Sequence, residues 1–325
     1  MSPALYARVA GALAGQAVGD ALGAPADGLS AYDVSIRFQK IDDYFGGRGR
    51  FSLATRLGYG LAFAFRKGPT PEASQKAHEQ VLVKIPSESI DDWVRLGIVA
   101  DPKLPMLSRG HATSVGVEIV AKLCPLGAWA ATVDDMDDNK LLMACKLAAL
   151  PTHAFRPSIL SSFVVVKIIK EVIRNHDAYS RSTDLFEKEG SLLHQVIEFC
   201  RGVEGKLPPE EMNAGSIAER LAYVRARLQG RCRPVEFATL NGHSRDVLEM
   251  VSFSVFCFMN RPEEFKAVIE SIGFGGKAVV RGAILGAMIG AFTGVRDIPP
   301  ALVRDVDGSN MVLALAKELT DREER

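Results

Sequence analysis

The sequence predicts an all-helical protein, and three observations support this fold class. Five segments carry apolar residues at spacings of three and four, as one face of an α-helix requires. They are Asn139 to Leu150, Ile159 to Ile173, Gly215 to Leu228, Arg245 to Met259 and Glu263 to Ile272. No run alternates between polar and apolar residues, which is the pattern of a half-buried strand. Glycine also recurs every fourth residue near both ends of the chain.

The two glycine series predict how the centre of the protein is built. They consist of Gly11, Gly15, Gly19 and Gly23 near the start, and Gly282, Gly286, Gly290 and Gly294 near the end. A glycine inside a helix costs about 0.5 to 1 kcal/mol relative to alanine, so the repetition indicates a packing purpose. Small residues allow two helix backbones to approach closely. We therefore expect two central helices, from opposite ends of the chain, to pack against each other.

Helix boundaries and loops follow from local signals. Pro262, followed by Glu263 and Glu264, is typical of a helix start, with proline at the first position and acids in the first turn. The polar stretches 177–190 and 202–212 are predicted to be surface loops. Because no linker divides the chain convincingly, we expect one helical domain spanning residues 1–325.

Composition excludes several classes of protein. With 47% hydrophobic residues, the chain has enough apolar material for a large core. Its 39 basic and 39 acidic residues balance, so no overall field attracts nucleic acid or an anionic membrane. The apolar stretch from Ala278 to Val295 is long enough to consider as a membrane span. Arg281 and the glycines inside it favour a buried helix instead, and we expect neither nucleic acid nor membrane as a partner.

The cysteines and the missing motifs narrow the chemistry further. Five cysteines lie far apart with no Cys-x-x-Cys pair, which argues against disulfides and a zinc site and predicts reduced thiols in a cytoplasmic protein. The sequence contains no Gly-x-Ser-x-Gly elbow, no P-loop and no His-Glu-x-x-His motif. Mechanisms based on those motifs are therefore unsupported.

Several motifs, taken in order, resemble one known family. Gly11 to Gly15 followed by Gly19-Asp20-Ala21-Leu22-Gly23-Ala24-Pro25 resembles the first helix of the ADP-ribosylglycohydrolases, which include the dinitrogenase reductase-activating glycohydrolases. Thr152-His153 with Pro157 is similar to a later motif, and Gly275 to Pro299 to the glycine-rich final helix. Cys124-Pro125-Leu126-Gly127 is a weaker match. The ordered set spans residues 8–315, although 178–234 matches nothing.

This resemblance implies a compact orthogonal helical bundle with a cleft for an ADP-ribosyl group and, in active members, two magnesium ions. The family's Thr-Asp-Asp-Thr segment corresponds to Ser52-Leu53-Ala54-Thr55, and its Gly-Gly-Asp-Thr-Asp-Thr to Gly275-Gly276-Lys277-Ala278-Val279-Val280. Magnesium requires hard oxygen ligands, which Leu53, Ala54 and Val279 lack. Lys277 also places a cation where the resemblance puts an anion. We therefore expect no dimagnesium centre and no cofactor.

The basic residues near this altered segment are candidates for binding an anion. Lys277 and Arg281 are four residues apart, which places them on one helix face if the last helix begins near Lys277. Together with the helix N-terminus, and with Arg56, they could bind a phosphate or carboxylate where the metals have been lost. In the alternative interpretation, Lys277 caps a loop and Arg281 reaches solvent or an internal acid.

Asp27 is the first candidate for a general acid or base, because the resemblance aligns it with an acidic residue of the family. A carboxyl group in a dry cleft can have a raised pKa. Lys277 is the second catalytic candidate, either stabilising negative charge or acting as a nucleophile. Asp27 could equally be an exposed turn residue before Gly28. Asp20, inside the first helix, is expected to be a structural hydrogen-bonding acid.

The remaining ligand-binding candidates are polar or loop residues. They are Ser52, Thr55, Gly110, His111, His153 and Gly276. Ser52 and Thr55 keep neutral oxygens in the altered segment. His111 lies on a stretch that resembles a loop facing the family's cleft. His153 is either a polar contact to the ligand or a hydrogen-bonded structural side chain.

Three functions follow from these observations. The first is a catalytically altered or inactive family member that binds an ADP-ribosyl, nucleotide or other phosphorylated ligand, or an ADP-ribosylated protein. The second is a metal-independent enzyme of hydrolase or lyase type, using Asp27 for proton transfer and Lys277 or Arg281 to stabilise an anion. The third is a structural or scaffolding protein, since the same fold is found among jellyfish eye-lens crystallins.

Overall fold

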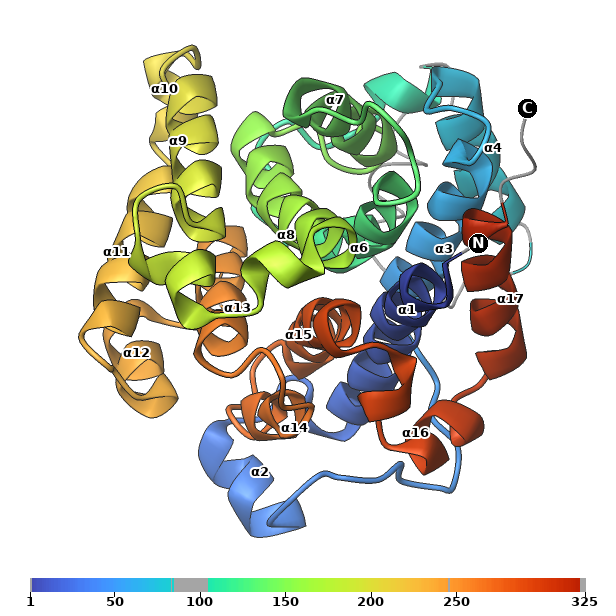
Figure 1. Ribbon diagram of the computed structural model, residues 1–325, viewed down its shortest axis with the longest axis vertical. Helices are drawn as coiled ribbons and strands as arrows, with labels where there is room; N and C mark the ends of the chain where they lie inside the picture. Colours follow the sequence, from blue (N-terminus) through green and yellow to red (C-terminus); the bar gives the residue numbers. More distant parts are fainter. Residues whose placement is uncertain (1, 83, 85–104, 245, 322–325) are drawn as a thin grey trace.

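The computed structural model describes residues 2–82, 84, 105–244 and 246–321. Within these ranges the chain forms helices and turns without a β-sheet (Figure 1). The extended contacts there are isolated bridges that pair Ser30 with Gly275, Gly49 with Val306, and His111 with His153. The all-α prediction is confirmed.

Two long helices from opposite ends of the chain form the centre of the bundle. α1 (Pro3–Gly23) and α15 (Ala278–Thr293) lie side by side (Figure 1). A Cβ atom added at Gly15 would collide with the carbonyl group of Gly286, and one at Gly286 would collide with that of Gly15. The two backbones therefore touch directly, as the glycine spacing predicts.

The remaining helices surround this pair. In the first half of the chain, α6 packs on both α3 and α8, and α8 also contacts α7 and α15. These helices are α2 (Ala31–Phe38), α3 (Leu53–Phe65), α4 (Pro71–Leu82), α6 (Glu118–Ala130), α7 (Asp138–Ala149) and α8 (Arg156–Arg174). The start of α3 is bonded to Asp20 of α1. The start of α15 is bonded to Glu118, at the start of α6, and to Asp27, in the turn after α1.

The second half of the chain first forms an outer layer of helices and then contributes α15 and α17, which pack against α1. In Figure 1, α9 to α12 lie on one side of the molecule beyond α13, and α17 lies next to α1. The bounds are α9 (Leu192–Glu204), α10 (Pro209–Met212), α11 (Ile217–Gln229), α12 (Pro234–Asn241), α13 (Val247–Asn260), α14 (Lys266–Ile272), α16 (Pro300–Asp305) and α17 (Ser309–Thr320).

The strongly periodic segments give the helices that the sequence predicts. The segments 139–150, 159–173 and 215–228 correspond to α7, α8 and α11, with boundaries shifted by one to three residues. The segment 245–259 corresponds to α13, although residue 245 itself lies outside the described residues. A shift of this size is ordinary at frayed helix ends.

The predicted start of α14 is wrong. The helix begins at Lys266, whereas Pro262 and Glu263 belong to a preceding turn. The side chain of Arg261 reaches forward to Glu264 and to Glu270, and Phe265 is buried with 6% of its surface exposed. The turn therefore brings Phe265 into the core before the helix starts, which proline and two acids alone could not indicate.

Both predicted surface loops are partly helical. The stretch 177–190 contains the end of a short turn, His176–Tyr179, and a π-helical turn, Thr183–Glu187, which buries Leu185 and Phe186. In the stretch 202–212, α9 continues to Glu204 and α10 occupies the last four residues. Such short elements contain too few apolar residues to show a helical period.

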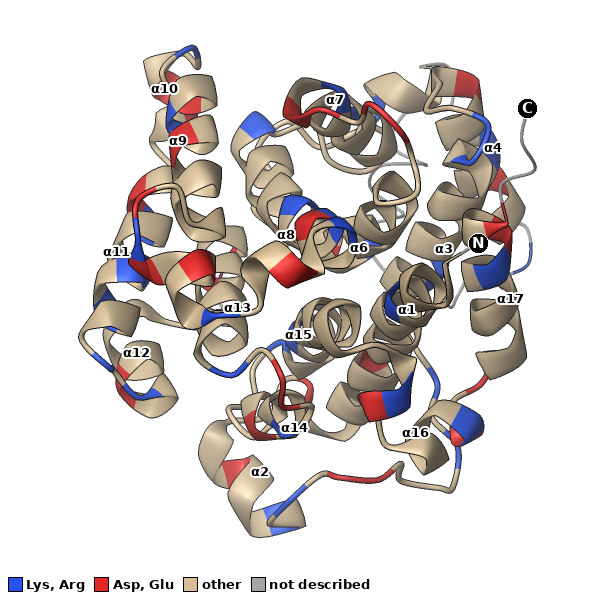
Figure 2. Cartoon of the chain, in the orientation of Figure 1, with Lys and Arg blue, Asp and Glu red and all other residues tan. Residues whose placement is uncertain are grey.

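The structure also bears on the expectations about membrane spans and disulfides. None of the described helices is long and apolar enough to span a membrane, and α15 is enclosed by neighbouring helices. The five cysteines are all buried and free, which confirms that they form no disulfides. Figure 2 shows basic and acidic residues intermingled on the outer helices and also present on α1 and α8, in keeping with a net charge of zero.

Candidate functional site

A buried carboxylate joins α1 to the start of α3. Asp20, with 1% of its surface exposed, accepts hydrogen bonds from the backbone N–H and hydroxyl of Ser52, at 2.8 and 2.7 Å, and from the hydroxyl of Thr55. Burial raises the pKa of Asp20 to about 6, against the lowering effect of these hydrogen bonds. Asp20 thus links α1 to the start of α3 through hydrogen bonds, as expected of a structural acid. The hydroxyls of Ser52 and Thr55, both predicted to contact a ligand, contact Asp20.

The rest of this segment presents hydrocarbon. Leu53 and Ala54 lie in the first turn of α3 and are buried, with 8% and 2% exposed. Val279 occupies the first turn of α15. Among the described residues, no group of three or more His, Cys, Asp or Glu side chains is placed to hold a metal ion.

Lys277 forms an ion pair that the sequence did not reveal. Its ammonium, on a side chain with 49% exposed, donates a hydrogen bond of 3.0 Å to Oε1 of Glu118. Glu118 is the first residue of α6, and Lys277 immediately precedes α15, so the pair joins two helix starts. No motif links these positions, because 159 residues separate them.

Asp27 caps α15. Its Oδ1 accepts a hydrogen bond of 3.1 Å from the backbone N–H of Val279, where the positive end of the helix dipole favours a carboxylate. Asp27 is exposed and precedes Gly28, which has a φ of +77°. The side chain has the exposed turn position of the alternative interpretation, with capping as an added role.

The glycine loop before α15 pairs with the chain after α1. The N–H of Gly28 donates to the carbonyl of Gly276, and the N–H of Gly276 donates to that of Leu29, both at 2.7 Å. Gly276 has a φ of +62°, and a Cβ there would collide with the hydroxyl of Ser244. Gly276 therefore shapes this loop through its backbone conformation.

Arg281 lies behind the same loop and away from solvent. It is fully buried, and its guanidinium donates to the carbonyls of Ser271 and Gly275, at 2.9 and 2.5 Å. A third contact joins it to Nδ1 of His243 at 3.2 Å. Burial lowers its pKa to about 10, so it stays charged at neutral pH. The structure does not bring the guanidinium of Arg281 to the exposed ammonium of Lys277, because the two side chains point to different environments.

Gly110, His111 and His153 come together through backbone pairing. The N–H of His111 donates to the carbonyl of Thr152, and the N–H of Ala154 donates to the carbonyl of His111, both at 3.1 Å. A Cβ at Gly110 would lie 2.9 Å from backbone atoms of His153 and Ala154, so this close pairing requires glycine. The imidazole of His111 is exposed, whereas that of His153 is 1% exposed.

A buried lysine that the sequence did not single out lies behind His153. Lys122, fully buried in α6, donates to the hydroxyl of Thr152 and lies 3.5 Å from Nε2 of His78. The Thr152 hydroxyl also lies 2.9 Å from Nδ1 of His153. Burial lowers the pKa of Lys122 to about 7, and burial together with Lys122 lowers those of His78 and His153 to about 3. Both histidines are therefore neutral.

The ion pair and His153 meet beside Gly116. A Cβ added at Gly116 would lie 3.2 Å from Oε2 of Glu118, 3.3 Å from the hydroxyl of Ser114 and 3.4 Å from Nε2 of His153. We call Ser114, Glu118, His153 and Lys277 the α6 cluster. Carboxylate, hydroxyl, imidazole and ammonium groups gather here at the N-terminal end of α6.

Arg56 belongs to a different region. Its guanidinium lies 5.7 Å from the ring of Phe51 and lines a cavity of about 600 Å³ between α3, α4 and α17. This cavity shares no lining residue with the α6 cluster. The structure therefore does not place Arg56 beside Lys277.

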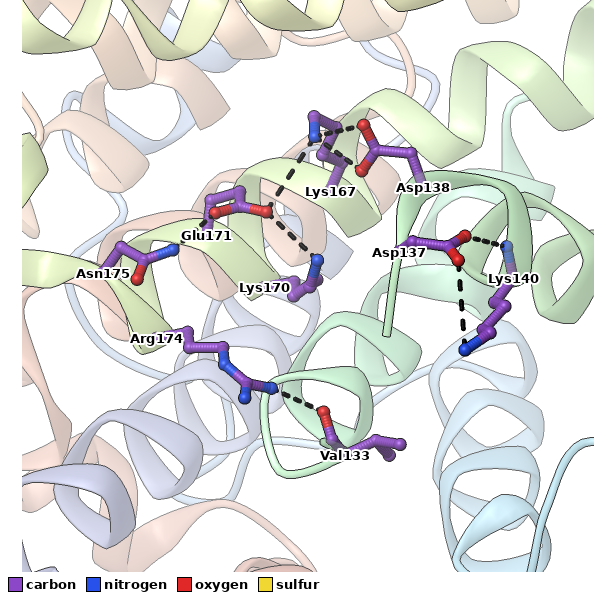
Figure 3. Close-up of polar contacts among 9 residues, drawn as sticks. All are labelled: Val133, Asp137, Asp138, Lys140, Lys167, Lys170, Glu171, Arg174 and Asn175. Atoms are coloured by element: carbon purple, nitrogen blue, oxygen red, sulfur yellow. Dashed lines mark hydrogen bonds and ion pairs between the residues drawn. The ribbon is translucent and has the colours of Figure 1, made fainter. Parts of the chain in front are cut away.

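A separate network of charges connects α7 with α8 (Figure 3). The ammonium of Lys167 donates to both carboxylate oxygens of Asp138, at 2.6 and 2.7 Å. Glu171 accepts from Lys170 at 3.1 Å and from Asn175 at 2.7 Å. Because these groups satisfy one another, we interpret this network as a structural link between the two helices.

The comparisons with known proteins agree with this architecture. A sequence profile described as ADP-ribosylglycohydrolase matches residues 1–325. A solved structure named "ADP-ribosylglycohydrolase-related protein complex" is similar in fold, with a TM-score of 0.67 and 19% identity, over 97% of this chain and 98% of that chain. No curated protein matches the sequence. The match over the full length shows that the chain belongs to the ADP-ribosylglycohydrolase family.

Proposed function

We propose that this protein binds an ADP-ribosyl group, a nucleotide or another phosphorylated ligand without a dimagnesium centre. The ion pair between Lys277 and Glu118 is the observation that carries this proposal. The resemblance places a magnesium-binding carboxylate at position 277, and an ammonium with its own carboxylate partner occupies that place here.

The described residues at the starts of α3 and α15 do not fit two magnesium ions. Magnesium demands oxygen ligands in near-octahedral geometry, usually with carboxylates among them. Leu53, Ala54 and Val279 offer hydrocarbon, and the carboxylate of Asp20 is occupied by Ser52 and Thr55. A divalent cation at the start of α15 would also be repelled by the ammonium of Lys277.

The α6 cluster suits an anion better than a cation. The ammonium of Lys277 is half exposed and is a strong donor to phosphate oxygens. The exposed imidazole of His111 lies on the loop that pairs with His153. A phosphorylated ligand would share the ammonium of Lys277 with Glu118.

Thermal unfolding of the whole chain tests this proposal, because a ligand of the native state raises the apparent stability. ADP-ribose, AMP and inorganic phosphate should be compared in EDTA and in excess magnesium. We expect ADP-ribose to raise the Tm equally in both conditions. A rise that requires magnesium, or no rise with any of these ligands, would contradict the proposal.

Substitution of Lys277 locates the site. Lys277→Met should weaken ADP-ribose binding about tenfold or more, since a hydrogen bond to a charged group contributes ~1.5–3 kcal/mol. Lys140→Met is the matched control, because Lys140 is a comparably exposed lysine paired with Asp137 on α7. The control should bind ADP-ribose like the unmodified protein. Equal binding by both variants would exclude Lys277 from the site.

A further inference from the structure

The cavity between α3, α4 and α17 is lined mainly by apolar side chains. Its apolar lining residues are Phe51, Tyr59, Phe63, Ala77, Val81, Met311, Val312, Ala314 and Leu315. Two of them, Phe63 and Met311, have 41% and 56% of their surface exposed. At about 600 Å³, the cavity falls within the usual size range of small-molecule sites. Exposed apolar surface gathered in one hollow indicates a binding site.

The charges around this cavity are unbalanced. Its two acids are already paired, Glu318 with Arg66, and Asp307 with Arg50 at 3.4 Å. Its two bases, Arg56 and Lys84, have no ion-pair partner in the part of the chain that the structure describes. The guanidinium of Arg56 rests against the ring of Phe51, which leaves its donors available to a ligand. The cavity therefore combines apolar walls with uncompensated positive charge.

We propose that this cavity binds a fatty-acid anion, with the carboxylate on Arg56 and the acyl chain against Phe63, Met311 and Leu315. An arginine forms two parallel hydrogen bonds with a carboxylate, which suits this head group. Most side chains that line the cavity are apolar, so an acyl chain is buried there without leaving polar groups unpaired. This inference is independent of the ligand proposed for the α6 cluster.

Calorimetric titration of the whole chain with dodecanoate, below its micelle concentration, tests the proposal. We expect saturable binding of one dodecanoate per chain and binding at least tenfold weaker for dodecyltrimethylammonium, which has the opposite charge. Equal affinity for both would show that the positive charge plays no part. No binding of dodecanoate, the result if another part of this chain or a second copy fills the cavity, would also overturn the proposal.

Two substitutions separate the head group from the chain. Arg56→Gln should weaken dodecanoate binding about tenfold, which corresponds to ~1.4 kcal/mol, and Met311→Trp should weaken it by filling the cavity. Arg37→Gln, at an exposed arginine of α2 outside this cavity, is the control and should bind normally. Unfolding by urea should show that each variant is folded. Normal binding by both folded cavity variants would place the dodecanoate elsewhere and contradict the assignment.

Discussion

The ammonium of Lys277 and the carboxylate of Glu118 meet at 3.0 Å, joining the starts of two helices that lie 159 residues apart in the chain. With side chains 49% and 19% exposed, the pair is expected to contribute only about 0 to 1 kcal/mol to stability. Its main effect is therefore on the local electrostatics, because it places an ammonium and a carboxylate at the N-terminal ends of α6 and α15.

Reversing the charge at Lys277 should create sensitivity to magnesium. Lys277→Asp would remove the ammonium and place a second carboxylate beside Glu118, and neighbouring carboxylates bind hard divalent cations. We expect magnesium to raise the Tm of this variant measurably and to leave the unmodified protein unchanged. Differential scanning fluorimetry at fixed ionic strength checks this.

Lys277→Gln provides the control for that experiment, since it removes the positive charge without adding a carboxylate. It should not respond to magnesium. If the unmodified protein itself gained stability from magnesium, the proposed loss of the metal site would be wrong.

Sequence motifs and periodicity predict the helices at the centre of this protein. The side-chain contacts of the candidate site become visible only in the structure. The glycine spacing predicted the central pair of helices because a backbone contact leaves a mark at every fourth residue. Glu118 left no such mark, because a single ion pair between positions 159 residues apart produces no repeating pattern. The four-residue spacing suggested one site for Lys277 and Arg281, but Lys277 lies outside α15 with a non-helical backbone, and Arg281 is buried.

The stability of the central pair should depend on its glycines. Gly15→Ala would drive a methyl group into the carbonyl of Gly286, which belongs to the backbone and cannot rotate away. We expect a loss of roughly 1–3 kcal/mol or more, as for an overpacked core, despite the better helix propensity of alanine. Urea denaturation followed by circular dichroism measures the change.

Gly202→Ala is the matched control, because Gly202 lies in α9 and a Cβ there meets nothing within 4 Å. Its expected effect is a gain of about 0.5 to 1 kcal/mol from helix propensity alone. Similar effects at both positions would refute close backbone contact as the reason for the glycine spacing.

Lys122 should make stability depend on pH. Its pKa is lowered to about 7 in the folded protein, so between pH 7 and its unfolded value the unfolded state binds more protons. The cost of the buried charge is complete below pH 7 and is relieved as the pH rises, with a slope of up to about 1.4 kcal/mol per pH unit. His78 and His153, with pKa values near 3, stay neutral throughout.

Lys122→Met should remove this contribution while leaving other titrating groups in place. The free energy of unfolding of both proteins should be measured by urea denaturation from pH 6.5 to 9. We expect the free energy of unfolding of the variant, relative to that of the unmodified protein, to fall as the pH rises above 7. Parallel curves for the two proteins would show that Lys122 titrates normally.

Replacing Glu171 should lower stability more than replacing an exposed acid, because Glu171 forms ion pairs with two buried lysines (Figure 3). Its carboxylate lies 3.1 Å from the ammonium of Lys170 and 3.9 Å from that of Lys167, and the lysine side chains are only 8% and 5% exposed. Glu171→Gln would leave two buried ammonium groups facing a neutral amide. Removing one partner of a buried pair typically costs ~3–5 kcal/mol, and the remaining carboxylate of Asp138 places the expected loss near the lower value.

The comparison with Glu198→Gln isolates burial as the cause. Glu198 pairs with Arg201 on α9, where both side chains are about half exposed, so this variant should change stability by less than ~1 kcal/mol. Urea denaturation at pH 7 measures both variants. Buried ammonium groups depend on their carboxylate partner more than exposed ones do. If Glu171→Gln lowered the free energy of unfolding no more than Glu198→Gln, the network between α7 and α8 would behave like an exposed ion pair, and burial would not be the cause.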